Sequence, residues 1–391
     1  MTIRSCAAGT ALAFGHFVAI GARAQAQMPE SLRPSIATQI DVDRFGRDSI
    51  ARSQIGALPG VGEVRILRPQ LEGRLHWPFE WRYLFTLEVT SSYRQNMHGT
   101  LFPNFIQLTF PISHVGNLVV GKQREGVSMQ MFESRQYQPF MERAPVVTAF
   151  LPTRNDGVRL GNTALDDRLG WSLGAFNSWL TNNLTFPENG SQLNGRIYGS
   201  PILKDDARQL VHVGLSARWS EAQLDSLRFR SRPQANGAPN FIDTKQLATN
   251  GATMLGGELA LVHGPASLTS ELLGTRVNQD PTSRTFYGYY AELSWFPRGE
   301  FRKYEKSSGT LRRVEMGDHI NTFEIALNFN HTNLTSGDVD GGILDRGNLA
   351  LSWYRRRGLR FEINAGLGRL DRSNTVGRTS FLLSRVQWYL E

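Results

Sequence analysis

The chain is almost free of cysteine, with Cys6 the only one among 391 residues. We expect Cys6 to leave with an N-terminal export signal, so the mature chain would hold no disulfide and no reactive thiol. Beyond its N-terminus the chain also lacks any run of eighteen apolar residues, and its mean hydropathy is −0.32. A spanning helix needs roughly 20 apolar residues, so a helical membrane protein is excluded. A membrane β-barrel is not excluded, because its strands expose only alternate residues to lipid.

Signatures of catalysis and of cofactor binding are missing as well. There is no H-E-x-x-H metal motif, no G-x-S-x-G nucleophile elbow and no P-loop. Neighbouring aspartates at 166–167 and 205–206 are more typical of turns than of an acid–base pair, and residues 338–345 lack the ligand spacing of a calcium loop. We therefore expect no enzyme, no metal and no cofactor.

The N-terminal segment has the pattern of an export signal. Arg4 precedes a mostly apolar stretch at 7–20, and small-x-small sites at 22–24 and 24–26 favour cleavage after Ala26. The formal charge is +8, and removing residues 1–26 with their two arginines leaves 41 basic against 35 acidic residues, or +6. Because export makes a nucleic-acid partner unexpected, this charge points to an anion-favouring pore or an acidic lipid surface.

Alternation with a period of two residues dominates the remaining chain and is clearest at 286–304. One face of this segment carries Tyr287, Tyr289, Ala291, Leu293 and Trp295, and the residues between them are mostly polar. Aromatic residues at the ends and aliphatic ones in the middle are typical of a strand that crosses a bilayer, with its other face in water. A strand of a soluble sandwich also alternates, so one strand cannot distinguish the two folds, and the recurrence of the pattern along the chain has to distinguish them.

The pattern recurs from Arg65 to the C-terminus, and about sixteen strands can be counted if weaker segments near 157, 225 and 310 are included. In these strands the face opposite the apolar one is repeatedly polar and must contact water. The apolar face must therefore contact something else, and lipid fits. We predict an all-β fold, a transmembrane antiparallel β-barrel of about 16 strands. The predicted divisions are a signal peptide at 1–26, a periplasmic lead-in at 27–60 with a short helix near 48–54, and the barrel at 61–391. Long connections are expected at 123–155, 180–208, 231–252 and 331–345.

Residues 123–155 break the alternation and are rich in Met, Phe, Gln, Arg and Pro. The segment is too long for a turn and too apolar for a solvated loop tip, and long loops in compact folds are usually functional. We interpret it as an inward-folded constriction loop that narrows the pore. The alternative is an external loop packed against a neighbouring subunit.

Nine basic residues lie on predicted inward positions or beside this loop. They are the candidate pore-lining and anion-binding residues Arg68, Arg74, Arg82, Lys122, Arg124, Arg135, Arg143, Arg154 and Arg159. Guanidinium groups present several donors in a plane that suits phosphate or carboxylate oxygens. The alternative is that these arginines pair with Glu125, Glu133 and Glu142 and only fix the loop.

Several stretches, taken in order, resemble the phosphate-selective porin O and P family of outer-membrane channels. They are 118–122 (LVVGK), 140–143 (FMER), 152–158 (PTRNDGV), 211–214 (VHVG), 288–290 (GYY), 298–304 (RGEFRKY) and 348–354 (NLALSWY). The resemblance implies a sixteen-stranded trimeric barrel in outer-membrane lipid that passes small anions, in some members phosphate. The chain departs from the family in ending with Leu390 and Glu391 rather than an aromatic residue.

Two other functional classes remain open on the sequence alone. A barrel enzyme, such as an outer-membrane hydrolase, would need a Ser/His/acid or paired-acid site near one rim. A soluble exported binding protein would partition into the aqueous phase without detergent. The favoured hypothesis is a passive diffusion porin for small hydrophilic solutes, with a preference for anions.

Overall fold

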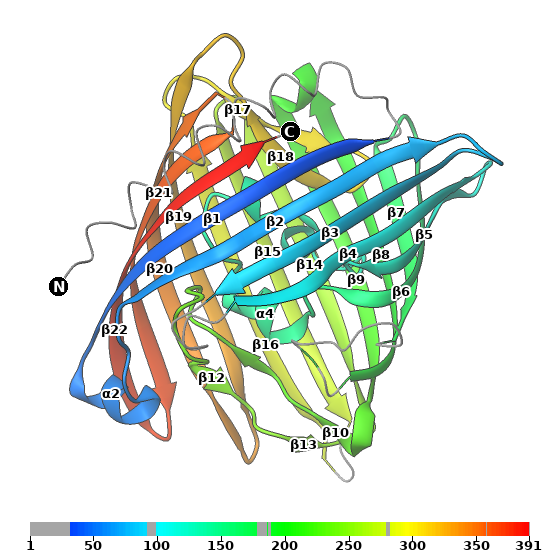
Figure 1. Cartoon of the computed structure of the whole chain (residues 1–391). Helices are drawn as coiled ribbons and strands as arrows, with labels where there is room; N and C mark the ends of the chain where they lie inside the picture. Colours follow the sequence, from blue (N-terminus) through cyan, green and yellow to red (C-terminus); the bar gives the residue numbers. More distant parts are fainter. Residues whose placement is uncertain are drawn as a thin grey trace.

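The computed structural model describes residues 32–91, 99–177, 186, 189–278, 282–356 and 358–390 (Figure 1). Sixteen antiparallel strands form one closed barrel, in which each strand pairs with the next and β1 closes the wall against β22. The first nine barrel strands are β1 (Arg33–Arg47), β2 (Val61–Leu75), β3 (Trp81–Ser91), β4 (Gly99–Ile112), β5 (Gly116–Gln123), β6 (Asn155–Ala164), β7 (Leu169–Phe176), β8 (Asn189–Lys204) and β9 (Gln209–Ala222). The other seven are β14 (Gly251–His263), β15 (Ala266–Asn278), β16 (Arg284–Trp295), β19 (Asn321–Ser336), β20 (Val339–Arg355), β21 (Leu359–Arg372) and β22 (Thr375–Leu390).

The barrel has two different rims. At the terminal rim β1 begins beside the end of β22, with Ile36 opposite Leu390. Most connections at this rim are short turns, but residues 296–320 carry the hairpin of β17 (Phe301–Glu305) and β18 (Thr310–Glu315). The opposite rim carries the helix α2 (Ser49–Ile55) and two long connections, 124–154 and 223–250. In Figure 1 the terminal rim lies at the top, with β17 and β18, and α2 lies at the bottom.

Both long connections of the opposite rim fold inside the barrel. Residues 124–154 contain α3 (Met129–Phe132), the 3-10 turn η3 (Arg135–Tyr137) and α4 (Pro145–Phe150), and this inward loop confirms the predicted constriction loop. Residues 223–250, the second loop, form two small sheets from the two-residue strands β10 (Ser226–Leu227), β11 (Arg230–Ser231), β12 (Ile242–Asp243) and β13 (Leu247–Ala248). Among the described residues none of the helices is long and apolar enough to cross a membrane.

The outer face of the wall carries the alternation that the sequence predicts. On β16 the outward Tyr287, Tyr289, Leu293 and Trp295 are exposed, Leu293 to 47%, while Tyr290 and Glu292 between them are buried. Because large apolar side chains on a soluble surface would be costly in such numbers, this face is suited to hydrocarbon.

An apolar core inside the barrel joins the two loops to one half of the wall. Val147, Phe150, Phe229 and Phe241 of the loops pack with buried side chains of β14–β16 and β19–β22. We call this half the packed wall, and we call β2–β7 the open wall. The two loops therefore fill the lumen unequally, and free space remains along the open wall.

Four details of the predicted organisation are wrong. The lead-in does not extend to residue 60, because β1 is a full barrel strand, although the predicted helix near 48–54 is confirmed as α2. Residues 189–204 form β8 rather than a loop, and 331–345 belong to β19 and β20. The segments near 225 and 310 lie in β10 and β18, inside the barrel instead of in its wall.

The fourth error concerns the inward polar face, which does not everywhere meet water. Glu292, Glu324 and Glu362 of the packed wall are buried. The predicted signal peptide lies outside the described residues and stays a prediction.

Candidate solute pathway

The constriction loop is fixed to the packed wall by hydrogen bonds from its backbone to wall side chains. Glu271 of β15 accepts from the backbone N–H groups of Met129 (3.0 Å) and Gln130 (2.7 Å). On β21, Arg360 donates to the carbonyls of Gln138 (2.8 Å) and Pro139 (3.0 Å). Because hydrogen bonds from a charged guanidinium contribute about 1.5–3 kcal/mol each, the Arg360 bonds, together with those of Glu271, hold the loop as a fixed part of the lumen.

Glu142 is the electrostatic centre of the constriction loop. Its carboxylate lies 2.7 Å from Arg65, 3.2 Å from Arg135 and 3.0 Å from Arg385. Burial alone would raise the pKa of Glu142, but the nearby Arg65 and Arg385 hold it below its usual range. The group is therefore ionised at neutral pH and ties the loop to β2 and β22.

The hairpin β17–β18 enters the lumen from the terminal rim and reaches the constriction loop. Arg196 of β8 donates to the carbonyls of Ser308 (2.6 Å) and Gly309 (3.0 Å). Arg302 of β17 forms an ion pair with Glu133 of the constriction loop. Elements from the two rims therefore meet inside the barrel.

The second loop is anchored by a cluster of amides. The side-chain oxygen of Gln234 accepts from Asn328 (3.3 Å), Asn330 (3.0 Å) and Asn348 (3.0 Å) on β19 and β20. Asn236 donates to both carboxylate oxygens of Glu63 on β2 (2.9 and 3.0 Å). The loop thus spans from the packed wall to the start of the open wall.

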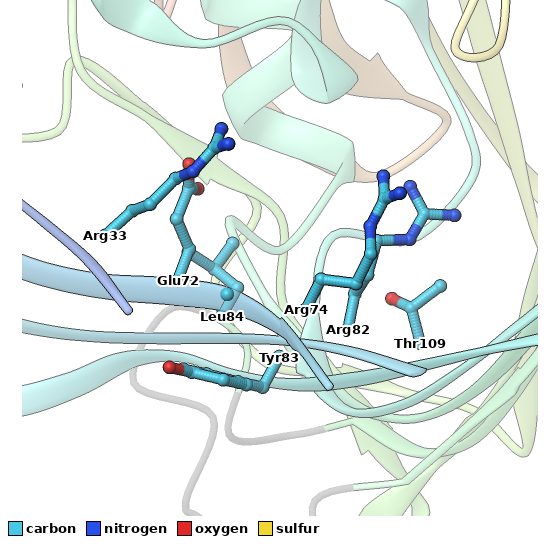
Figure 2. A pocket seen from close by; sticks show the side chains of 8 residues that line it. Arg33, Glu72, Arg74, Arg82, Tyr83, Leu84 and Thr109 are labelled. Atoms are coloured by element: carbon cyan, nitrogen blue, oxygen red, sulfur yellow. The ribbon is translucent and has the colours of Figure 1, made fainter. Parts of the chain in front are cut away.

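A basic pocket of about 300 Å³ opens in the lumen at the terminal rim (Figure 2). Arg74 of β2 and Arg82 of β3 are direct partners across the strand pair, and their guanidinium groups lie side by side. Arg33 of β1 lies next to Glu72 in the same pocket. Arg82 donates to Asn117 (3.1 Å), and Arg74 is 3.6 Å from the half-exposed Glu80.

Two further spaces follow the open wall toward the opposite rim. A space of about 250 Å³ is bordered by Arg82, Arg159 and Arg196, with Phe132 and Ser308 of the inward segments. A chamber of about 400 Å³ lies between the two loops. Its charged lining consists of Arg65, Arg135, Arg143, Arg230, Arg232 and the single acid Glu142. Arg82 lines both of the first two spaces, so these two spaces adjoin near the terminal rim.

Paired charges and a cation–π contact lie on the open wall and the constriction loop between these spaces. Arg68 forms a buried ion pair with Glu88, and Arg135 lies 4.0 Å from the same carboxylate. The guanidinium of Arg154 lies 4.2 Å from the ring centre of Phe105, within the range of a cation–π contact.

The nine predicted basic residues all lie on the open wall or on the constriction loop, but they are not equivalent. Arg143 borders the far chamber, yet it is buried and donates to the carbonyls of Gln130, Met131 and Glu133. Arg124 donates to the carbonyl of Phe132. These two side chains shape the loop, whereas Arg74 and Arg82 face open space.

Lys122 and Arg159 occupy the middle of the open wall. Arg159 donates to Gln123 (3.2 Å) and lies 4.9 Å from the ring centre of Phe132. Lys122 is half-buried on β5, directly opposite Asp156 of β6. Both side chains are therefore less available to a solute than Arg74 and Arg82.

The glutamates of the loop mostly pair with arginines outside the predicted set. Glu125 binds Arg218 (2.6 Å) and Glu133 binds Arg302, whereas Glu142 also binds Arg135 of the predicted set (3.2 Å). Sequence reasoning missed the lining residues Arg33, Arg65, Arg196, Arg230 and Arg232. Arg33 and Arg196 lay in segments interpreted as lead-in or loop, and nothing local distinguishes Arg230 from a solvated residue.

Comparisons with known proteins agree with this architecture. The model of the family described as phosphate-selective porin O and P matches residues 39–390. An uncharacterised protein of Caulobacter vibrioides is 28% identical over 268 residues, which are 64% of this chain and 53% of that protein, so the chain spans about half the length of this relative.

Several solved structures share the fold. An anion-selective porin from Comamonas acidovorans has a TM-score of 0.58 at 9% identity, covering 92% of this chain and 99% of that one. OprB of Pseudomonas putida has a TM-score of 0.56 at 10% identity, covering 92% and 94%. The trimer form of OmpT from Vibrio cholerae has a TM-score of 0.53 at 10% identity, covering 92% and 100%.

Proposed function

Because the chain belongs to the phosphate-selective porin O and P family and is an outer-membrane porin, we propose that it passes small hydrophilic solutes with a preference for anions, phosphate among them. The observation that carries this proposal is the side-by-side placement of Arg74 and Arg82 in an open pocket of the lumen (Figure 2). Like charges directly across a strand pair repel each other, so an anion between them is stabilised by both.

The free space along the open wall supports a basic route for the solute. Arg33, Arg74 and Arg82 border the terminal-rim pocket, and the chamber near the opposite rim is lined by five arginines against Glu142. In a narrow lumen with low-dielectric walls, such side chains concentrate anions and repel cations, as charged rings do in other pores. Most of these arginines already have protein partners, which favours passage over tight retention.

Reversal potentials across a planar bilayer in a salt gradient test the proposal. The protein is expected to prefer chloride and phosphate over potassium. The double substitution Arg74→Gln/Arg82→Gln should lower the anion-to-cation permeability ratio about threefold, because exposed charge interactions contribute about 0.2–1 kcal/mol each. The matched control is Arg355→Gln, an exposed arginine at the end of β20. A cation preference of the unmodified protein would overturn the proposal.

We also propose that the porin assembles as a homotrimer through the outer face of the open wall. β5 and β7 have eight residues each, fewer than the ~9–11 that a tilted membrane strand needs. A short wall is poorly matched to hydrocarbon, and a second copy would cover it. Native mass spectrometry in detergent should give three chains, and a persistent monomer would contradict the assembly.

The hydrolase alternative would need an acid–base pair that a substrate can reach. One candidate inside the lumen is His212, whose Nε2 lies 3.0 Å from Glu258 and whose Nδ1 lies 2.7 Å from the hydroxyl of Tyr304. His212 is 0% exposed. We therefore propose that this cluster holds the β17–β18 hairpin, and assays on ester and peptide substrates should be negative.

A further inference from the structure

A line of ionisable side chains crosses the outer face of β19–β22 near the opposite rim. In the strand register His331 lies opposite Asp345, Asp345 opposite Arg369, and Arg369 opposite Arg378. The Nδ1 atom of His331 is 2.6 Å from Asp345, and Arg369 is 3.2 Å from Asp345 and 2.9 Å from Asp371. Charged side chains on the outer face of a membrane barrel are costly at the bilayer centre and tolerated only at its interfaces.

The height of this line on the wall matches the edge of the hydrocarbon. On β20 Asp345 is eight residues from Trp353, and on β21 Arg369 is eight residues from Phe361; these two outward aromatic rings lie against each other near the terminal rim, 5.5 Å between centres. At about 3.3 Å per residue and a tilt of about 40°, eight residues span about 20 Å, close to the ~25 Å apolar band of outer-membrane barrels. The line therefore lies where lipid headgroups begin.

On the terminal-rim side of the line, β21 and β22 offer apolar contacts. Leu367 of β21 and Leu382 of β22 are outward and exposed to 71% and 51%. Leu367 lies two residues before Arg369 on the same face. A molecule seated here would meet aliphatic side chains at one level and guanidinium groups at the next.

The basic end of the line has unused hydrogen-bonding capacity. In the part of the chain that the structure describes, the exposed guanidinium of Arg378 has no ion pair and no hydrogen bond. Arg369 is 47% exposed and directs contacts to two carboxylates, which leaves some of its five N–H donors available. Two arginines directly across a strand pair repel each other unless an anion lies between them.

We propose that Arg369 and Arg378 bind the phosphate group of a membrane lipid, with Leu367 and Leu382 contacting its acyl chains. The longer connections of a bacterial barrel face outward, so the opposite rim lies in the outer leaflet. His331 and Asp345 are positioning residues, because the bond from Asp345 fixes the orientation of Arg369. This site lies on the outside of the wall and is independent of the solute pathway.

Native mass spectrometry of the full chain in a neutral detergent tests the site. The probes are diphosphorylated lipid A, its dephosphorylated form and inorganic phosphate. Lipid A should bind, and Arg378→Gln should weaken it about fivefold, since a basic residue near a lipid surface contributes about 1 kcal/mol. Arg369→Gln/Arg378→Gln should weaken it further, and high salt should do the same.

Arg355→Gln is the matched control, because Arg355 is an exposed outward residue at the other end of β20. It should leave lipid binding unchanged. Arg378→Gln removes no ion pair of the described protein, so a folding defect is not expected to obscure its effect. Equal binding by all variants, or equal binding of the dephosphorylated lipid, would overturn the proposal. Displacement of lipid A by equimolar inorganic phosphate would identify a free-anion site and overturn the lipid assignment.

Discussion

The packed wall and the open wall have the same strand alternation but opposite environments on their inner faces. Inward residues of the packed wall, such as Glu271 and Arg360, are covered by the constriction loop and bind its backbone. Inward residues at the terminal rim of the open wall, such as Arg74 and Arg82, border free space. An inward arginine can therefore either hold the structure together or contact a solute, depending on whether an inward-folded loop covers it.

The largest effect is expected from breaking a clamp of the packed wall. The guanidinium of Arg385 lies 2.7 Å from Asp41 and 3.0 Å from Glu142, and Arg385→Met removes this buried partner from both carboxylates. Removing one member of a buried ion pair costs about 3–5 kcal/mol, so the free energy of unfolding should fall by that order. Urea unfolding followed by tryptophan fluorescence measures it. In the control, Arg355→Met, the exposed site should change stability by less than about 0.5 kcal/mol.

A somewhat smaller effect should follow from a cavity beneath the second loop. Phe241 is fully buried against Phe381 of β22. Phe241→Ala should destabilise the loop by about 3 kcal/mol and make single-channel conductance larger and noisier, because the loop would leave the packed wall part of the time. Leu224→Ala, at an exposed position of the same loop, is the control, and equal conductance in both variants would contradict the packed-core account.

Acid should loosen the constriction loop through Glu142. Its pKa is lowered in the folded protein, so its ion pairs stabilise the loop fully above the ordinary value of 4.5 and lose that contribution as pH falls through the lower folded value. Open-channel noise and protease sensitivity of residues 124–154 should therefore rise below pH 4.5 and stay constant between pH 5 and 8. In Glu142→Gln both should be raised at every pH, so an unchanged acid response in this variant would assign the transition to another group.

The smallest effect is expected from a partly shielded arginine of the open wall. Arg159 borders the middle space but stacks on Phe132 and donates to Gln123. Arg159→Gln should lower anion selectivity about twofold with little change in stability. Arg143→Gln should lower stability with little change in anion selectivity, because Arg143 donates hydrogen bonds to three carbonyls of its own loop. Bilayer recordings paired with unfolding curves separate the two outcomes, and a large selectivity loss in Arg143→Gln would contradict the division.

The predicted count of sixteen strands is confirmed, but it was reached by missing two wall strands, β1 and β8, and counting two segments that are not in the wall. β1 escaped sequence reasoning because its outward Ile40 and Val42 alternate with Asp41 and Asp43, which looks like a charged lead-in. β8 escaped because glycines dilute its outer face. Short alternating pieces near 225 and 310 were counted instead, since two residues of β10 or six of β18 do not reveal whether their partner is the wall or a loop.

The amino-acid pattern alone was enough to predict a membrane barrel and the side of most strands that meets lipid, and it favoured an inward fold for residues 123–155 over an external loop. These features depend on a period of two residues and on local composition, which can be read within one strand or loop. Which inward charges are covered and which border open space became visible only in the folded barrel. That outcome depends on where the two loops and the β17–β18 hairpin come to rest, through contacts such as Arg302 with Glu133, which are 169 residues apart, and no local pattern encodes such a pairing.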